Sequence, residues 1–157
     1  MSQSAEIARI QDELHRAYDG DCWHGPPLKA VLAGITAQVA AAKHPVVTHT
    51  IWELVNHLDA WVEVVTLRLT EWRAIEEPAM GDFPPPAGTT PVTWEVDLGR
   101  LDHHYRQLCE AVAAFDAGRL GEIVPGKDYP VPVMLHGTAQ HLAYHAGQIA
   151  LLKKLVA

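Results

Sequence analysis

Basic side chains are scarce in this sequence. The chain has 12 Lys and Arg residues against 19 Asp and Glu residues, which gives a formal net charge of −7 at pH 7. An acidic chain repels phosphate backbones, so we expect no nucleic-acid partner. The sequence also has no cluster of Lys and Arg of the kind that binds an anionic membrane surface.

Cysteine is rare as well, and Cys22 and Cys109 are the only two. This pair forms neither a disulfide framework nor the spacing of a zinc or redox motif. No apolar run approaches the roughly 20 residues that span a bilayer, and segment 1–14 is too polar for a secretory signal. These absences predict a protein of the reducing cytoplasm that has no membrane partner.

Several catalytic patterns are missing too. The sequence has no glycine-rich phosphate loop, no Ser-His-Asp order and no pair of catalytic carboxylates, and its alternation is too weak to predict a β-sheet. Hydrophobic residues nevertheless make up 48% of the 157 residues. This content suffices for one buried core, so we predict a single domain over residues 1–157.

Apolar residues recur at helical spacing along most of the chain, which predicts an all-α fold. We expect Gly34 and Thr36 to split one of the periodic segments into two short pieces. A long loop rich in proline covers residues 77–92, and a second connector covers 116–131. The predicted helical segments are residues 4–18, 28–43, 51–76, 93–115 and 132 to the C-terminus.

Segment 93–115 gives the clearest evidence for a helix bundle. Its apolar residues follow a 4-3-4-3 spacing without a miss, which is typical of a helix that buries one face. They are Trp94, Leu98, Leu101, Tyr105, Leu108, Val112 and Phe115. Segment 51–76 opens with a capping-box pattern, in which Thr50 is the N-cap and Glu53 reaches back to it.

The ten histidines are an unusually high number for this length. His141 and His145 are four residues apart on a predicted helix, so their rings stand on one face and can grip one metal ion. Chance alone gives roughly 0.6 such pairs in a chain with this many histidines. Both residues lie on the apolar face of the helix, where an unpaired ring costs about 1–3 kcal/mol. The alternative is two core histidines that are bonded to carbonyl or hydroxyl groups.

A third ligand has to come from another helix, and His57 flanks the apolar stripe of segment 51–76. Three neutral imidazoles that leave one position open form the arrangement of catalytic zinc sites, and they also suit nickel or iron. Glu53 is either an outer partner that orients His57 or simply the capping-box residue.

Other residues near these histidines are expected outside the ligand set. His49 and His136 are candidates for the mouth of a pocket, whereas the adjacent His103 and His104 are expected on a solvated face. We expect that Asp59 and Tyr144 are not metal ligands, because helical spacing turns both away from the ligand face.

Three blocks of the sequence resemble the DinB/YfiT-like superfamily of bacterial metal-dependent enzymes. They are CWHGPPL (22–28), HTIWELVNHLDAW (49–61) and MLHGTAQHLAYHAGQIALLKK (134–154), and their order and spacing match those of the family. The resemblance places the family's metal triad on His57, His141 and His145. It also implies a four-helix bundle with an up-down-down-up course, and a homodimer.

The resemblance implies an enzyme that acts on a small-molecule substrate through a divalent ion, Zn²⁺ or Ni²⁺. Thiol S-transfer and hydrolysis are the two expected reaction types, and the first would use a low-molecular-weight thiol as co-substrate. The alternatives are a non-catalytic module that binds a small molecule or stress ligand through the metal, and a structural bundle that binds metal adventitiously. The sequence identifies no general acid or base.

Overall fold

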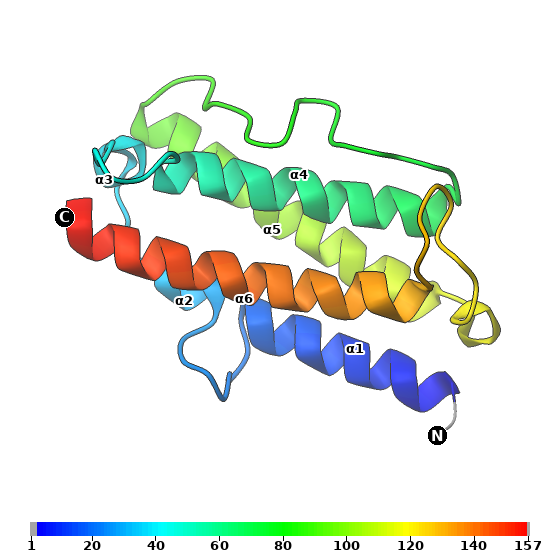
Figure 1. Ribbon diagram of the computed structural model, residues 1–157. Helices are drawn as coiled ribbons and strands as arrows, with labels where there is room; N and C mark the ends of the chain where they lie inside the picture. The colour runs from blue at the N-terminus through cyan, green and yellow to red at the C-terminus, as the bar shows by residue number, and fades with distance from the viewer. Residues whose placement is uncertain (1–2, 157) are drawn as a thin grey trace.

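The computed structural model describes residues 3–156, and its architecture is dominated by four long helices (Figure 1). These are α1 (Gln3–Tyr18), α4 (Ile51–Thr70), α5 (Pro91–Ala114) and α6 (Val131–Val156). The connectors contain α2 (Leu28–Leu32), α3 (Ala37–Ala41) and a 3₁₀ turn, Ala117–Arg119. Over the described residues the only β-type pairing is one isolated bridge between Ile123 and Pro130. The prediction of an all-α fold is therefore confirmed.

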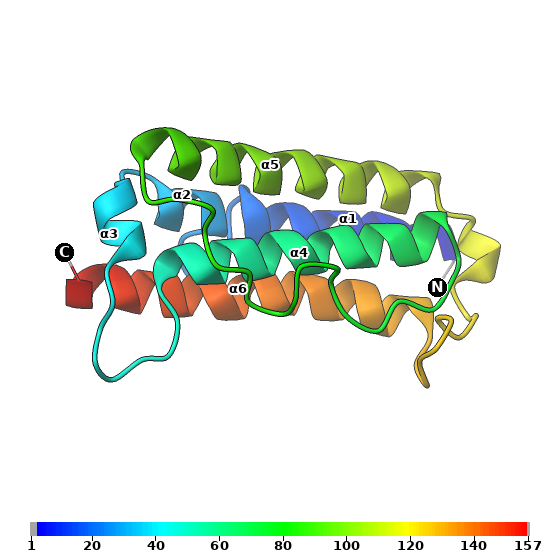
Figure 2. The ribbon, with the colours of Figure 1, turned by 90° about the horizontal axis from the view of Figure 1, so that it is seen from above.

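The long helices lie side by side in two adjoining pairs. Helix α1 packs on α6 and α4 packs on α5, while contacts of α4 with α6 and of α1 with α5 join the pairs. The colours in Figure 1 show that α4 and α5 run in one direction, and α1 and α6 in the other. Because α4 and α5 are parallel, the chain between them must return along the whole length of α4. Figure 2 shows this return segment, residues 71–90, lying across α4.

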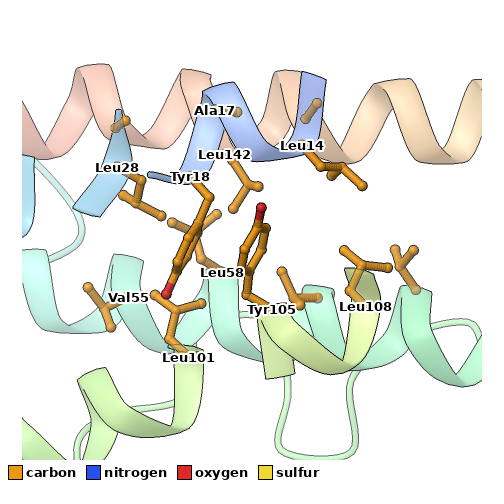
Figure 3. Close-up of a cluster of buried hydrophobic side chains, with 14 of the residues drawn as sticks. Leu14, Ala17, Tyr18, Leu28, Val55, Leu58, Leu101, Tyr105, Leu108 and Leu142 are labelled. Atoms are coloured by element: carbon orange, nitrogen blue, oxygen red, sulfur yellow. The ribbon is translucent and has the colours of Figure 1, made fainter. Parts of the chain in front are cut away.

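The core lies where the four helices face one another (Figure 3). The predicted stripe of α5 is confirmed, since five of its seven residues are buried and Leu98 and Phe115 pack against the core from its edge. In the cluster of Figure 3, Tyr105 of α5 stacks on Tyr18 of α1 with ring centroids 3.7 Å apart. The buried residues of the stripe are Trp94, Leu101, Tyr105, Leu108 and Val112.

Helix α4 is shorter than its apolar pattern predicts, because it ends at Thr70 instead of residue 76. Trp72 has a φ of 48°, so the backbone leaves the right-handed helical region there. The guanidinium of Arg68 donates to the carbonyl of Ile75, which holds the reversed chain against the helix. Trp72 still packs against Phe115, with ring centroids 6.0 Å apart.

Capping side chains explain where α3 and α5 begin. Thr36 accepts a hydrogen bond from the backbone of Val39 and begins α3, which confirms the predicted break after α2. Helix α5 begins two residues earlier than predicted, because Thr90 is its N-cap and forms a capping box with Thr93, and Pro91 suits the first turn.

Helix α6 begins at Val131 and is the longest helix. The predicted helix extends to the C-terminus, but Ala157 lies outside the described residues, as do residues 1–2 of the predicted domain. Neither α6 nor any other helix within residues 3–156 combines the length and apolar character needed to cross a membrane.

Candidate metal centre

The three histidines predicted as ligands lie together between α4 and α6. His57 comes from the second turn of α4, and His141 and His145 are one turn apart on α6. The Nε2 atom of His141 lies 2.9 Å from the Nε2 atom of His57 and 2.9 Å from that of His145. One ligand atom of each lies within 4.8 Å of the others, and no other such group of three His, Cys, Asp or Glu occurs within residues 3–156.

The ring of His57 is oriented by the return segment 71–90. Its Nδ1 donates to the backbone carbonyl of Asp82 at 2.7 Å, and the Asp82 side chain lies 3.1 Å from the same nitrogen. Phe83 stacks on the ring with centroids 4.1 Å apart. Trp61, one turn further along α4, donates to the Asp82 carboxylate at 2.7 Å. His57 is thus buried and fixed, with Nε2 directed at the other two histidines.

His145 is oriented from within α6. Its Nδ1 donates to Oε1 of Gln148 at 2.6 Å, and Nε2 of Gln148 donates to the hydroxyl of Tyr144 at 3.1 Å. The second contact sets the amide so that its oxygen faces His145. Outer partners of this kind select the ring tautomer that leaves the other nitrogen free for a ligand.

The protonation states favour a cation among the three Nε2 atoms. Burial lowers the pKa of all three histidines, and the pKa of His141 falls to about 4 with help from its two neighbours. The rings are therefore neutral at pH 7, and His57 and His145 already use their protons at Nδ1. If His141 carries its proton on Nε2, that proton can point to Nε2 of only one of the other two histidines. In at least one of the two 2.9 Å contacts, the lone pairs of two nitrogens therefore face and repel each other. A divalent ion relieves that repulsion, and neutral imidazoles are suitable ligands for it.

Two cavities meet at the triad. The larger, about 690 Å³, is bordered by all three histidines and by apolar residues of α4, α6 and the 42–50 connector. The smaller, about 450 Å³, shares His57 and His141 with it and extends toward the other end of α4. Both volumes fall in the usual range of small-molecule sites. The triad is thus accessible from both sides.

The structure assigns different surroundings to His49, His136 and Glu53. His49 lines the larger cavity and stacks on Phe83 at 3.7 Å, so its expected place at a pocket mouth is confirmed. The same expectation for His136 is wrong, because Glu6 and Glu13 of α1 hold its ring at 2.9 and 2.6 Å. Glu53 is the capping-box residue and accepts from the Thr50 backbone, so it is not the partner of His57.

Neither Asp59 nor Tyr144 belongs to the group of three candidate metal ligands, as helical spacing predicts. Asp59 is buried against α5, where it accepts hydrogen bonds from Arg100 and from His104 at 2.8 Å. His104 is therefore largely buried, contrary to prediction, while His103 is exposed as expected. Tyr144 is mostly exposed but still borders the larger cavity, because its hydroxyl turns back to Gln148.

Asp82 and Phe83 were not identified as site residues from the sequence. The only signal was the length of the proline-rich loop that carries them, since long loops in compact domains are often functional. Asn56 anchors this loop by donating to the carbonyl of Pro84 at 3.0 Å.

The chain belongs to the DinB superfamily, whose family model matches residues 26–149. The match covers α2 to most of α6 and includes all three histidines. DinB-like proteins are associated with metal binding. No match was found among the curated proteins or among the solved structures.

Proposed function

We propose that this chain is a metal-dependent enzyme that holds one divalent ion with His57, His141 and His145. The convergence of three neutral Nε2 atoms, two of them oriented by hydrogen bonds at Nδ1, is the observation that carries the proposal. Zn²⁺ and Ni²⁺ suit three imidazoles best. Such an ion would lower the pKa of a thiol or a water molecule bound to it.

The reaction we favour is addition of a thiol to an electrophilic small molecule, and hydrolysis is the second candidate. The larger cavity supports the first, because aliphatic and aromatic groups such as Leu54, Phe83 and Leu152 form most of its wall. Such a wall accommodates an apolar electrophile. His49 and Tyr144 border the same cavity and can hold a substrate by hydrogen bonds.

The four-helix topology and the homodimer implied by the resemblance also belong to this proposal. The opposite directions of the α1/α6 and α4/α5 pairs support an up-down-down-up course. For the dimer, support comes from exposed apolar side chains on the last turns of α6, Leu151 and Leu155. Light scattering at micromolar concentration tests it, and a monomer mass would refute it.

The first experiment is elemental analysis after loading with zinc or nickel, which should find close to one ion per chain. His57→Ala should lose tight binding and keep its circular dichroism spectrum, because a core of this size does not need a metal to fold. If the variant binds metal like the parent, His57 is not a ligand. If it unfolds, the ion is structural, and the enzyme proposal fails.

The second experiment measures turnover. The metal-loaded protein is incubated with low-molecular-weight thiols and a panel of electrophiles, and in parallel with activated esters alone. Thiol consumption that depends on the metal supports S-transfer, and ester cleavage without thiol supports hydrolysis. Metal binding without either reaction would indicate the non-catalytic binding module.

A further inference from the structure

The smaller cavity contains a buried cation that the metal proposal does not use. Arg68 lies in the last turn of α4 and is only 3% exposed. Its Nε and Nη2 atoms donate to the carbonyl of Ile75 at 3.0 and 2.5 Å, and Nη2 also contacts the carbonyl of Glu76 at 3.4 Å. No carboxylate of residues 3–156 lies within ion-pair distance of this guanidinium.

One nitrogen of Arg68 makes no hydrogen bond to the described part of the chain. Nη1 has no hydrogen-bond partner within residues 3–156, yet in this range no fully buried side-chain nitrogen or oxygen lacks a partner. Nη1 therefore keeps some accessible surface, and Arg68 is one of the residues that line the smaller cavity. A guanidinium nitrogen in that position offers two N–H groups to a ligand.

The positive charge of Arg68 is not neutralised locally. Glu76 is an acidic side chain that responds to it, but the pKa of Glu76 is lowered mainly by its hydrogen bond to Lys127, and Arg68 is the smallest of the causes. The Glu76 carboxylate pairs with Lys127 at 2.8 Å. Burial of a charge is costly unless the charge is paired, so the site favours an anion.

The walls between Arg68 and the triad are largely apolar. The Arg68 guanidinium carbon lies 5.8 Å from the centre of the Trp61 ring, and that ring lies 6.4 Å from the ring of His57. Val65 and Met134 complete this stretch. At the end near the triad, the carboxylate of Asp82 repels a second anion.

We propose that this cavity binds a carboxylic acid whose carboxylate pairs with Nη1 of Arg68 and whose apolar body lies along Trp61 and Val65. The other end of the acid lies against His57 and His141, and this part rests on the function proposed above. A carboxylate fits better than a phosphate, because one guanidinium balances one negative charge and the remaining wall is apolar. The repulsion by Asp82 fixes the direction of the ligand.

The test compares 6-mercaptohexanoate with 6-mercaptohexanol, together with shorter and longer homologues of each. Calorimetry measures their binding to the metal-free and the zinc-loaded protein. We expect the acid to bind at least tenfold more tightly than the alcohol in both forms. Arg68→Gln should remove this preference, a loss of roughly ten- to hundredfold for the acid alone, as expected for a hydrogen bond to a charged group. Arg73→Gln is the matched control, because it removes an equal charge from an exposed side chain outside the cavity.

Equal affinity for acid and alcohol in the parent overturns the proposal, and so does a preference that survives in folded Arg68→Gln. If that variant does not fold, Arg68→Lys replaces it. Lys keeps the charge, so it must preserve the acid preference, and loss of the preference in folded Arg68→Lys would count against a charge-based site. An affinity for the acid that zinc does not strengthen at any chain length would refute the placement of the far end at the triad. Failure of the metal proposal is recognised separately, because zinc then does not bind at all.

Discussion

The contact between Gln148 and His145 provides a sharp test of how the metal centre is organised. The amide oxygen of Gln148 accepts from Nδ1 of His145 at 2.6 Å and thereby leaves Nε2 free to face the other histidines. Gln148→Leu removes the acceptor and keeps a side chain of similar size. His145 can then adopt the other tautomer or rotate, and either change withdraws one ligand for part of the time.

Loss of an outer partner of a ligating histidine typically weakens metal binding by 10- to 100-fold. This corresponds to about 1.4–2.8 kcal/mol, since each tenfold change equals about 1.4 kcal/mol. We expect a weakening in this range for Gln148→Leu, measured by competition with a chromophoric zinc chelator. Gln148→Glu should bind zinc at least as tightly as the parent, because a carboxylate accepts the same hydrogen bond and makes the imidazole more basic.

The control for this prediction is Tyr144→Phe, which removes the hydroxyl that orients the amide but leaves the contact with His145 in place. Its effect should be smaller than that of Gln148→Leu. If Gln148→Leu keeps its helical content and melting temperature but binds zinc with the affinity of the parent, then Gln148 does not set the orientation of His145.

Three further predictions concern stability and specificity. Burial lowers the pKa of His136, but its two glutamate partners outweigh this effect and raise the pKa. The contribution of His136 to stability is therefore complete below about pH 6.5 and is lost as the pH rises through the raised pKa. His136→Gln should flatten that part of a plot of melting temperature against pH. Leu108→Ala should lower the free energy of unfolding by about 2–5 kcal/mol in chemical denaturation, because Leu108 is fully buried in the core. Asp59→Asn should leave the zinc stoichiometry unchanged, and loss of metal from the folded variant would show that our assignment of the ligand face is wrong.

The helical class and the pairing of His141 with His145 could be predicted because both depend on local spacing. A 4-3-4-3 stripe buries one face of a helix wherever that helix packs, and α5 follows this pattern. The i, i+4 spacing of His141 and His145 likewise brings their rings together on any regular helix. The position of His57 opposite them depends on how α4 and α6 pack, and for this residue the family resemblance supplied what spacing did not.

The orientation of His57 could not be predicted, because its partner is a backbone carbonyl. Any residue at position 82 offers that carbonyl, so the sequence carries no signal for it. The contact exists because the parallel course of α4 and α5 returns segment 71–90 along α4, where Asn56 and Trp61 hold it. The Asp82 side chain adds a second contact to Nδ1 of His57, but nothing in the local sequence distinguishes it from an ordinary loop aspartate.

The role of Arg68 could not be predicted, because the apolar pattern extends α4 to residue 76 and the helix ends at Thr70. In a helix that continues to residue 76, Arg68 is an interior position, and an arginine there is expected to extend into solvent. In the structure the helix ends at Thr70, and the reversed chain places the carbonyls of Ile75 and Glu76 around the guanidinium. Arg68 is therefore buried by the same turn that ends the helix, and two of its three nitrogens stabilise that turn. Only Nη1 remains for a ligand, which is why a fold control must accompany every substitution of Arg68.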